Sequence, residues 1–149
     1  MIRGEFGAMI ERVLVPMNDS EMAQRALRYA LEAHPEADIT VLHVVGAPSS
    51  MMGQAVGLAL SDDPEELARD KAHTVFETAE SIAAEYGIEI RTEFKIGHPV
   101  RGILAFIEDE PVDTVVMGTH GGTVEGRLFV GDVAKKIFRR SPVPVTSVR

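Results

Sequence analysis

The chain has 149 residues, which is within the usual size of one domain with one hydrophobic core. Hydrophobic residues make up 45% and charged residues 26%, which is typical of a folded globular protein and excludes a disordered chain. A net charge of −8 gives no overall basic surface for nucleic acid or an anionic membrane, and the lack of cysteine excludes disulfides and thiolate metal sites.

Residues 1–8 show no periodicity, and a second methionine, Met9, stands just before the first strand pattern. A Glu-Phe pair in this segment is what a common cloning site encodes. We therefore predict an expression-vector remnant at residues 1–8 and a single domain at residues 9–149. The start lacks a signal-peptide pattern, and no apolar run approaches the ~20 residues that span a bilayer, so we expect a cytoplasmic protein without a membrane partner.

The first part of the domain alternates between strand and helix patterns. The apolar run at residues 13–15 predicts a strand buried on both faces. Asn18 is predicted to cap a helix that ends near His34-Pro35, because Glu21 follows at capping-box spacing and apolar residues then recur at helical intervals. Residues 39–45 predict a second buried strand.

An irregular stretch follows at residues 46–62, and it contains the pair Met51-Met52. It is longer than the usual connection between a strand and a helix. Two interpretations remain open. The segment is either a mobile lid or adaptable partner surface, since methionines repack readily, or a partly helical surface excursion with no role of its own.

The second part of the domain continues the alternation. Asp63-Pro64 supplies a cap and a first-turn proline for a helix, and Gly87 is placed to end that helix in a left-handed turn. Residues 88–96 predict the third strand. Pro99 begins another helix, and residues 112–117 predict the fourth strand.

The last strand is predicted at residues 143–148, at a sheet edge, because Pro144 removes a ladder donor. Alternating strands and helices predict a doubly wound five-stranded parallel sheet of order 3-2-1-4-5, with helices on both faces. In this α/β order the connections after strands one and four diverge and leave a crevice. The loops at residues 17–20 and after Gly118 are therefore expected to face one another across a ligand site.

A glycine-bearing turn follows the fourth strand. The sequence Gly118-Thr119-His120-Gly121 is followed, after nine residues, by Gly131-Asp132, where we predict the start of the last helix. The free N–H groups and the dipole at the start of a helix attract anions, and phosphate is the most common ligand there. The other interpretation is that these glycines only form the turns of an ordinary connection between a strand and a helix and bind no ligand.

Several catalytic and metal motifs are absent from the sequence. It contains no Gly-x-x-x-x-Gly-Lys phosphate loop, no Gly-x-Gly-x-x-Gly, no Gly-x-Ser-x-Gly nucleophile elbow and no His-Glu-x-x-His helix. The histidines show no metal-ligand spacing; they are His34, His43, His73, His98 and His120. We therefore expect no catalytic residues and no metal site built from protein ligands.

Three motifs occur together: Val-Leu-Val-Pro-Met-Asn-Asp-Ser-Glu at residues 13–21, Leu42-His43-Val44, and Gly118-x-x-Gly121-x9-Gly131 followed by Pro-Val-Pro-Val at residues 142–145. From about Met9 to Arg149 the chain resembles the universal stress protein family. The resemblance implies a small α/β domain that forms a homodimer through its C-terminal edge strand. It also implies adenine-nucleotide binding (ATP, ADP or AMP), which a subset of that family shows.

The resemblance implies a set of nucleotide-binding residues. Carried over by position, they are those beside the base and metal region (Pro16, Met17, Asn18), beside the adenine (Val44), at the ribose and phosphates (Met117, Gly118, His120, Gly121) and at the helix end (Gly131, Asp132, Val133). Together they provide an apolar wall for a base and an N–H-rich end for phosphate.

Two positions depart from the family pattern. Asp132 stands where nucleotide-binding members have Ser or Thr, and Asn18-Asp19 stands where the family has Asp-Gly. The Asp132 carboxylate only accepts hydrogen bonds, is able to cap the predicted helix, and repels phosphate. An Mg²⁺ ion that bridges Asp132 or Asp19 to the phosphates would replace this repulsion with attraction.

Three functions follow from these observations. The first is a regulatory, non-enzymatic stress-response homodimer that holds an adenine nucleotide between strands one and four, with or without Mg²⁺. The second is a dimer that binds no nucleotide and acts through protein–protein interaction by its fifth strand and the Met51-Met52 stretch. The third, phosphoryl transfer, lacks a recognisable pair of base and nucleophile, although slow ATP hydrolysis is not excluded.

Overall fold

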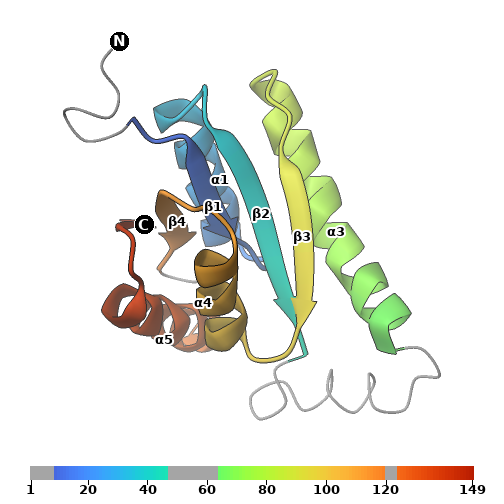
Figure 1. The fold of residues 1–149 in the computed structure, drawn as a ribbon. Coiled ribbons are helices and arrows are strands. Elements are labelled where there is room, and N and C mark those ends of the chain that lie inside the picture. Colours follow the sequence, from blue (N-terminus) through green and yellow to red (C-terminus); the bar gives the residue numbers. More distant parts are fainter. Residues whose placement is uncertain (1–8, 47–63, 120–123) are drawn as a thin grey trace.

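In a computed structural model the chain is described at residues 9–46, 64–119 and 124–149, without the side chains of residues 64 and 124–131 (Figure 1). The elements are β1 (Arg12–Pro16), α1 (Glu21–Ala33), β2 (Asp38–Val45), α3 (Pro64–Glu85), β3 (Arg91–Ile96), α4 (Pro99–Asp109), β4 (Thr114–Gly118), α5 (Val124–Arg140) and β5 (Val145–Val148). The predicted remnant, Met51-Met52 and His120-Gly121 lie outside the described residues. None of the helices described combines the length and apolar character needed to cross a membrane.

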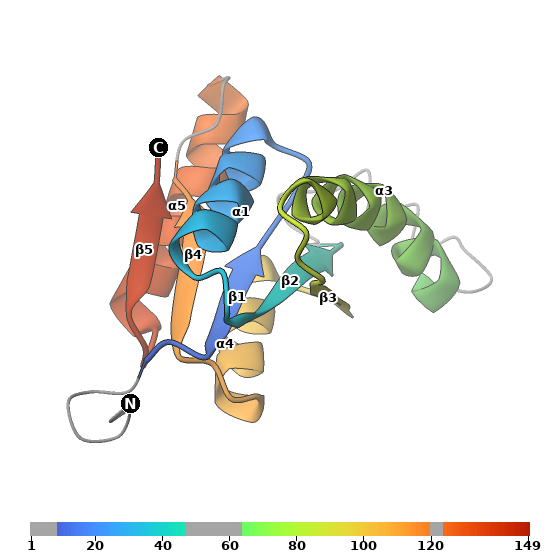
Figure 2. The same cartoon turned by 90° about the horizontal axis from the view of Figure 1, so that it is seen from above.

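The strands form one parallel sheet of order β3-β2-β1-β4-β5, which confirms the predicted doubly wound topology. β1 lies at its centre, with Val13 beside Ile39 of β2 and Thr114 of β4. Because the strands are parallel, their carboxyl ends meet at one edge. The connections that leave β1 and β4 at this edge lead to helices on opposite faces of the sheet (Figure 2).

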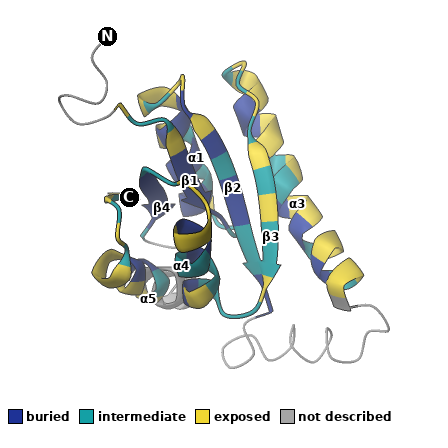
Figure 3. Ribbon diagram, in the orientation of Figure 1, coloured by how far each residue is buried: buried dark blue, intermediate teal, exposed yellow. Residues whose placement is uncertain are grey.

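Successive side chains of β1 enter two different cores, one on each face of the sheet. Val13 and Val15 pack with α1 and α3, whereas Leu14 packs with α4 and α5. Figure 3 shows the buried stripe along the central strands and the mixed burial of the helices. The continuous apolar run of a central parallel strand thus has a direct cause, because both of its faces are covered.

Helix α1 begins at Glu21, and the predicted capping role of Asn18 is wrong. Ser20 is the N-cap, since its Oγ accepts a hydrogen bond from the Ala23 N–H at 3.1 Å. Asn18 Oδ1 accepts from the Ser20 N–H at 2.9 Å and closes a turn just before the helix. The Asn18 side chain is therefore used locally, and the hydroxyl two residues later takes the cap.

Helix α5 begins at Val124, so the predicted helix start at Gly131-Asp132 is wrong and Asp132 is not a cap. A glycine in a helix interior costs only about 1 kcal/mol relative to alanine, so Gly131 permits a helix to continue through it. No proline interrupts the residues before it. The basic Arg139 and Arg140 occupy the last turn of α5, where they complement the helix dipole as expected.

The predicted end of α3 and the edge position of the last strand are confirmed by the structure, although β5 begins at Val145 and not at residue 143. Gly87, with φ of 68°, follows α3 in the left-handed conformation. Strand β5 pairs with β4 at the edge of the sheet, as the proline indicated, although Pro144 precedes the strand. The Pro144 carbonyl accepts from the Val115 N–H and from Thr114 Oγ1, each at 2.9 Å, and so begins the β4–β5 pairing.

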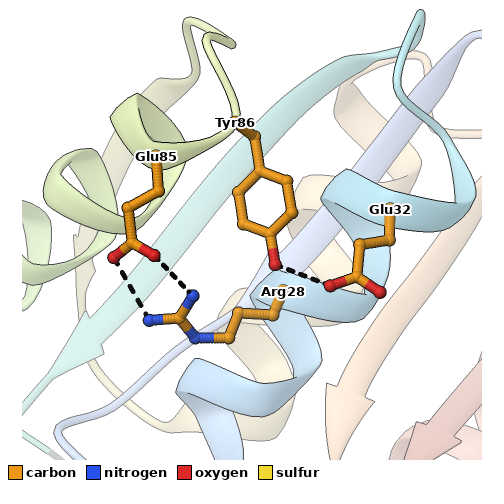
Figure 4. A network of polar contacts seen from close by, with 4 residues as sticks. All are labelled: Arg28, Glu32, Glu85 and Tyr86. Carbon is orange, nitrogen blue, oxygen red and sulfur yellow. Dashed lines mark hydrogen bonds and ion pairs between the residues drawn. The ribbon is translucent and has the colours of Figure 1, made fainter.

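Polar contacts join the ends of α1 and α3 (Figure 4). Arg28 donates to both carboxylate oxygens of Glu85, at 3.0 and 3.3 Å. The Tyr86 hydroxyl donates to Glu32 at 2.6 Å. These exposed contacts link the two helices on this face, whose packing depends mainly on the buried side chains that they share in one core.

Candidate functional site

A cavity of about 100 Å³ lies at the carboxyl edge of the sheet, between the loop after β1 and the end of β4. This is the crevice that the strand order predicts. Seven residues of the expected site line it; they are Pro16, Met17, Asn18, Val44, Met117, Gly118 and Val133. Residues from β1, β2, β4 and α5 that are distant in the sequence are thus brought together.

The walls of the cavity are mainly apolar. Val44 faces it from β2 and Met117 from β4, with Ile103 contributed by α4. Met117 is only 4% exposed and Ile103 only 3%, so these side chains are anchored in the core beneath. Such a wall suits a flat apolar surface better than a charged one, because a buried charge without a partner is costly.

The loop after β1 is held onto β2 by two hydrogen bonds. The Met17 N–H donates to the Leu42 carbonyl at 2.9 Å, and His43 Nδ1 lies 2.8 Å from the Met17 carbonyl oxygen. A carbonyl only accepts, so Nδ1 bears the proton and Nε2 of the neutral ring remains an acceptor. Burial lowers the pKa of His43, while the bond to Met17 and the charge of Asp19 oppose that shift. His43 is therefore a neutral ring beside the cavity at pH 7.

Gly118 allows α1 to approach the end of β4 closely. A Cβ built on Gly118 would lie 2.6 Å from the Met22 carbonyl oxygen and 2.9 Å from the Met22 Cβ. No real Cβ comes so near to main-chain atoms. The missing side chain therefore lets the first turn of α1 rest on β4, and this brings Ser20 and Ala23 to the cavity wall.

Four further residues belong to the expected site: His120, Gly121, Gly131 and Asp132. His120 and Gly121 lie outside the described residues. Gly131 and Asp132 lie within α5, directly before Val133, and the Asp132 side chain is exposed. Within the described ranges, no group of three or more His, Asp and Glu residues is placed to hold a metal ion.

Five further residues of the described lining were missed by sequence reasoning: Ala23, Leu42, His43, Pro99 and Ile103. Ser20 also lines the cavity, at the end of the loop at residues 17–20 that was expected to face the ligand. Two of the five missed residues come from α4, which begins at the carboxyl edge because it follows β3. The parallel topology was therefore a signal that the start of α4 would lie near the crevice.

His98 is the N-cap of this helix, and its buried Nδ1 has no hydrogen-bond partner among the described residues.

A doubly wound parallel sheet with a pocket where its strand order reverses is the architecture of a small-ligand-binding α/β domain. Residues 9–149 match the Universal stress protein family, and the chain therefore belongs to this family.

Relatives of known sequence or structure agree with that assignment. Universal stress protein MJ0531 of Methanocaldococcus jannaschii is 27% identical over 144 residues, which cover 95% of this chain and 83% of that protein. Universal stress protein UspA from Lactobacillus plantarum has a TM-score of 0.72 at 23% identity, covering 96% of this chain and 100% of that one. A universal stress protein solved in complex with cAMP has a TM-score of 0.67 at 25% identity, covering 94% and 97%.

Proposed function

We propose that this chain binds an adenine nucleotide in the cavity between β1 and β4 and acts as a regulatory module in the stress response. The observation that carries the proposal is the apolar cavity at the carboxyl edge, lined by seven of the residues that the family resemblance implies for nucleotide binding. The relative solved with cAMP supports the ligand class, since cAMP is itself an adenine nucleotide.

The two chemical parts of a nucleotide suit different parts of this edge. The base belongs against Val44, Ile103 and Met117, where burial of a flat ring removes apolar surface from water. The phosphates belong toward Gly118 and the start of α5, where main-chain N–H groups have no helical partner. Mg²⁺ would then be held chiefly by phosphate oxygens, with Asp19 as the protein carboxylate proposed to assist. Asp132 follows Val124 by eight residues, about 12 Å along α5, and is therefore not proposed as a ligand.

We propose binding and regulation rather than catalysis. His43 is the titratable ring at the cavity, and its Nδ1–H is already used by the Met17 carbonyl. Among the described residues that line the cavity, general-base chemistry would have to rely on Nε2 of His43, and no second titratable side chain there orients a nucleophile. Phosphate release from ATP at a rate typical of an enzyme, several turnovers per second, would contradict this part of the proposal.

The assembly that we propose is a cytoplasmic homodimer joined through β5. The two edges of the sheet differ: β3 has the charged sequence Arg91-Thr92-Glu93-Phe94-Lys95, whereas β5 has Val145-Thr146-Ser147-Val148. Charges discourage edge-to-edge pairing. The uncharged β5 edge therefore also favours the second candidate function, a dimer that works through protein–protein contacts without a nucleotide.

Calorimetric titration separates the two candidates. The wild-type chain and Val44→Phe are titrated with AMP, with cAMP and with ATP, the last with and without Mg²⁺. In Val44→Phe the bulkier aromatic side chain fills the cavity. The exposed Glu93→Gln on β3 is the matched control. We expect micromolar to millimolar binding by wild type and control, and at least about a tenfold loss (~1.4 kcal/mol) in Val44→Phe. No heat of binding at millimolar ligand would leave the interaction dimer as the function.

A further inference from the structure

Gly102 of α4 packs directly behind Val44, on the wall of the cavity. A Cβ built on Gly102 would lie 3.0 Å from Val44 Cγ2 and 3.2 Å from Val44 Cγ1. Carbon atoms in ordinary contact are about 3.5–4.0 Å apart, so the space accepts glycine without strain and alanine only if something moves. Val44 lines the cavity on one side and meets Gly102 on another.

The backbone does not explain a glycine at this position. The positive-φ glycines described are Gly46, Gly87 and Gly97, so Gly102 has no left-handed conformation to favour it. It lies inside α4, where glycine is the poorest helix former apart from proline. A packing reason is therefore needed, and Val44 supplies it.

Any added side chain at Gly102 would displace Val44 rather than the helix. Helix α4 is anchored by Val100, Ile103 and Phe106, which are 2%, 3% and 9% exposed in the core. Val44 is only partly buried, and the cavity is the free space beside it. Its γ-carbons would therefore turn or shift toward the cavity and narrow it.

We propose that Gly102 sets the width of the base site by letting α4 lie close behind Val44. The ligand in this inference rests on the proposed function, the binding of an adenine base. Gly102 is a positioning residue, because it acts through Val44 and has no contact of its own with the base. Bulk at Gly102 would be compensated by loss of bulk at Val44.

Four chains test the inference: wild type, Gly102→Ala, Val44→Ala and the double variant. Each is titrated with AMP by calorimetry, and Arg101→Ala, an exposed neighbour on the same helix, is the control. We expect Gly102→Ala to bind AMP about tenfold more weakly (~1.4 kcal/mol) without a lower melting temperature, since alanine is the better helix former. In the double variant, AMP binding should return to that of Val44→Ala, which a general folding defect would not produce.

The outcomes distinguish this inference from the function on which it rests. If wild type and Gly102→Ala bind AMP equally, the role of Gly102 is overturned and the proposed function stands. If wild type binds none of AMP, cAMP and ATP, the proposed function fails, and the role of Gly102 is then tested by a crystal structure of Gly102→Ala without ligand. Val44 turned or shifted into the cavity supports it, and an unmoved Val44 with α4 in place overturns it.

Discussion

The Nδ1–H of His43 donates to the Met17 carbonyl oxygen at 2.8 Å, so a side chain of β2 holds the loop that follows β1. The adjacent Met17 N–H donates to the Leu42 carbonyl of the same strand. Together the two bonds fix one wall of the cavity before any ligand arrives. A preorganised wall lowers the entropic cost of binding, because these groups are already ordered.

We predict that His43 makes the fold sensitive to mild acid. Because burial lowers its pKa, the unfolded chain takes up a proton near pH 6.5 and the folded chain only at lower pH. Its contribution to stability is complete above about pH 6.5 and is lost as the pH falls through the folded pKa, with a slope of at most ~1.4 kcal/mol per pH unit. Urea unfolding between about pH 5 and pH 7.5 measures this.

His43→Gln is the matched variant for that experiment. It should be less stable at neutral pH and should show a shallower loss of stability below about pH 6.5. Parallel pH profiles for wild type and variant would show that His43 is not the group responsible.

We predict that Gly118→Ala destabilises the fold strongly. The new Cβ would meet the main chain of Met22 at 2.6 Å, and main chain has no rotamer by which to move aside. The free energy of unfolding should fall by about 3 kcal/mol, the upper part of the range for overpacking. Gly102→Ala is a useful comparison, because its added Cβ meets only a side chain. An unchanged urea midpoint for Gly118→Ala would contradict the close packing of α1 on β4.

We predict a modest, phosphate-dependent effect of Asp132. Because this side chain is exposed and lies inside α5, it neither caps a helix nor forms part of the cavity lining. Exposed charges interact weakly, so Asp132→Asn should strengthen ATP binding about threefold, well under 1 kcal/mol, and leave AMP binding nearly unchanged. Asp109→Asn, at the other end of the sheet, is the control. A hundredfold gain would mean that Asp132 lies directly against the phosphates.

We predict that Ser147→Pro yields a monomer. The Pro144 and Val148 carbonyls accept from the β4 side, so the alternate residues Val145 and Ser147 direct their main-chain groups away from β4. Proline at Ser147 removes one outward N–H without breaking a β4–β5 bond. Light scattering at micromolar concentration should give twice the 16.2 kDa chain mass for wild type and the single mass for the variant. A monomeric wild type would contradict the proposed dimer.

The topology was predictable from the sequence because it depends on local patterns. The apolar runs of β1, β2 and β4 and the edge-marking Pro144 lead to strand order 3-2-1-4-5, and that order locates the crevice. The start of α5 was not predictable, because Gly131 is compatible both with a loop just before a helix and with the interior of a helix. The role of His43 was also hidden, since it depends on a contact with Met17, 26 residues away in the sequence.

The central claim is that an adenine base enters the cavity between β1 and β4. Methyl NMR on methionine-labelled protein tests it most directly, because Met17 and Met117 line the cavity, whereas Met9 is an exposed residue just before β1. During titration with AMP, we predict saturable ring-current shifts at Met17 and Met117 and none at Met9. Saturating AMP that leaves both cavity methyls unshifted would contradict the account.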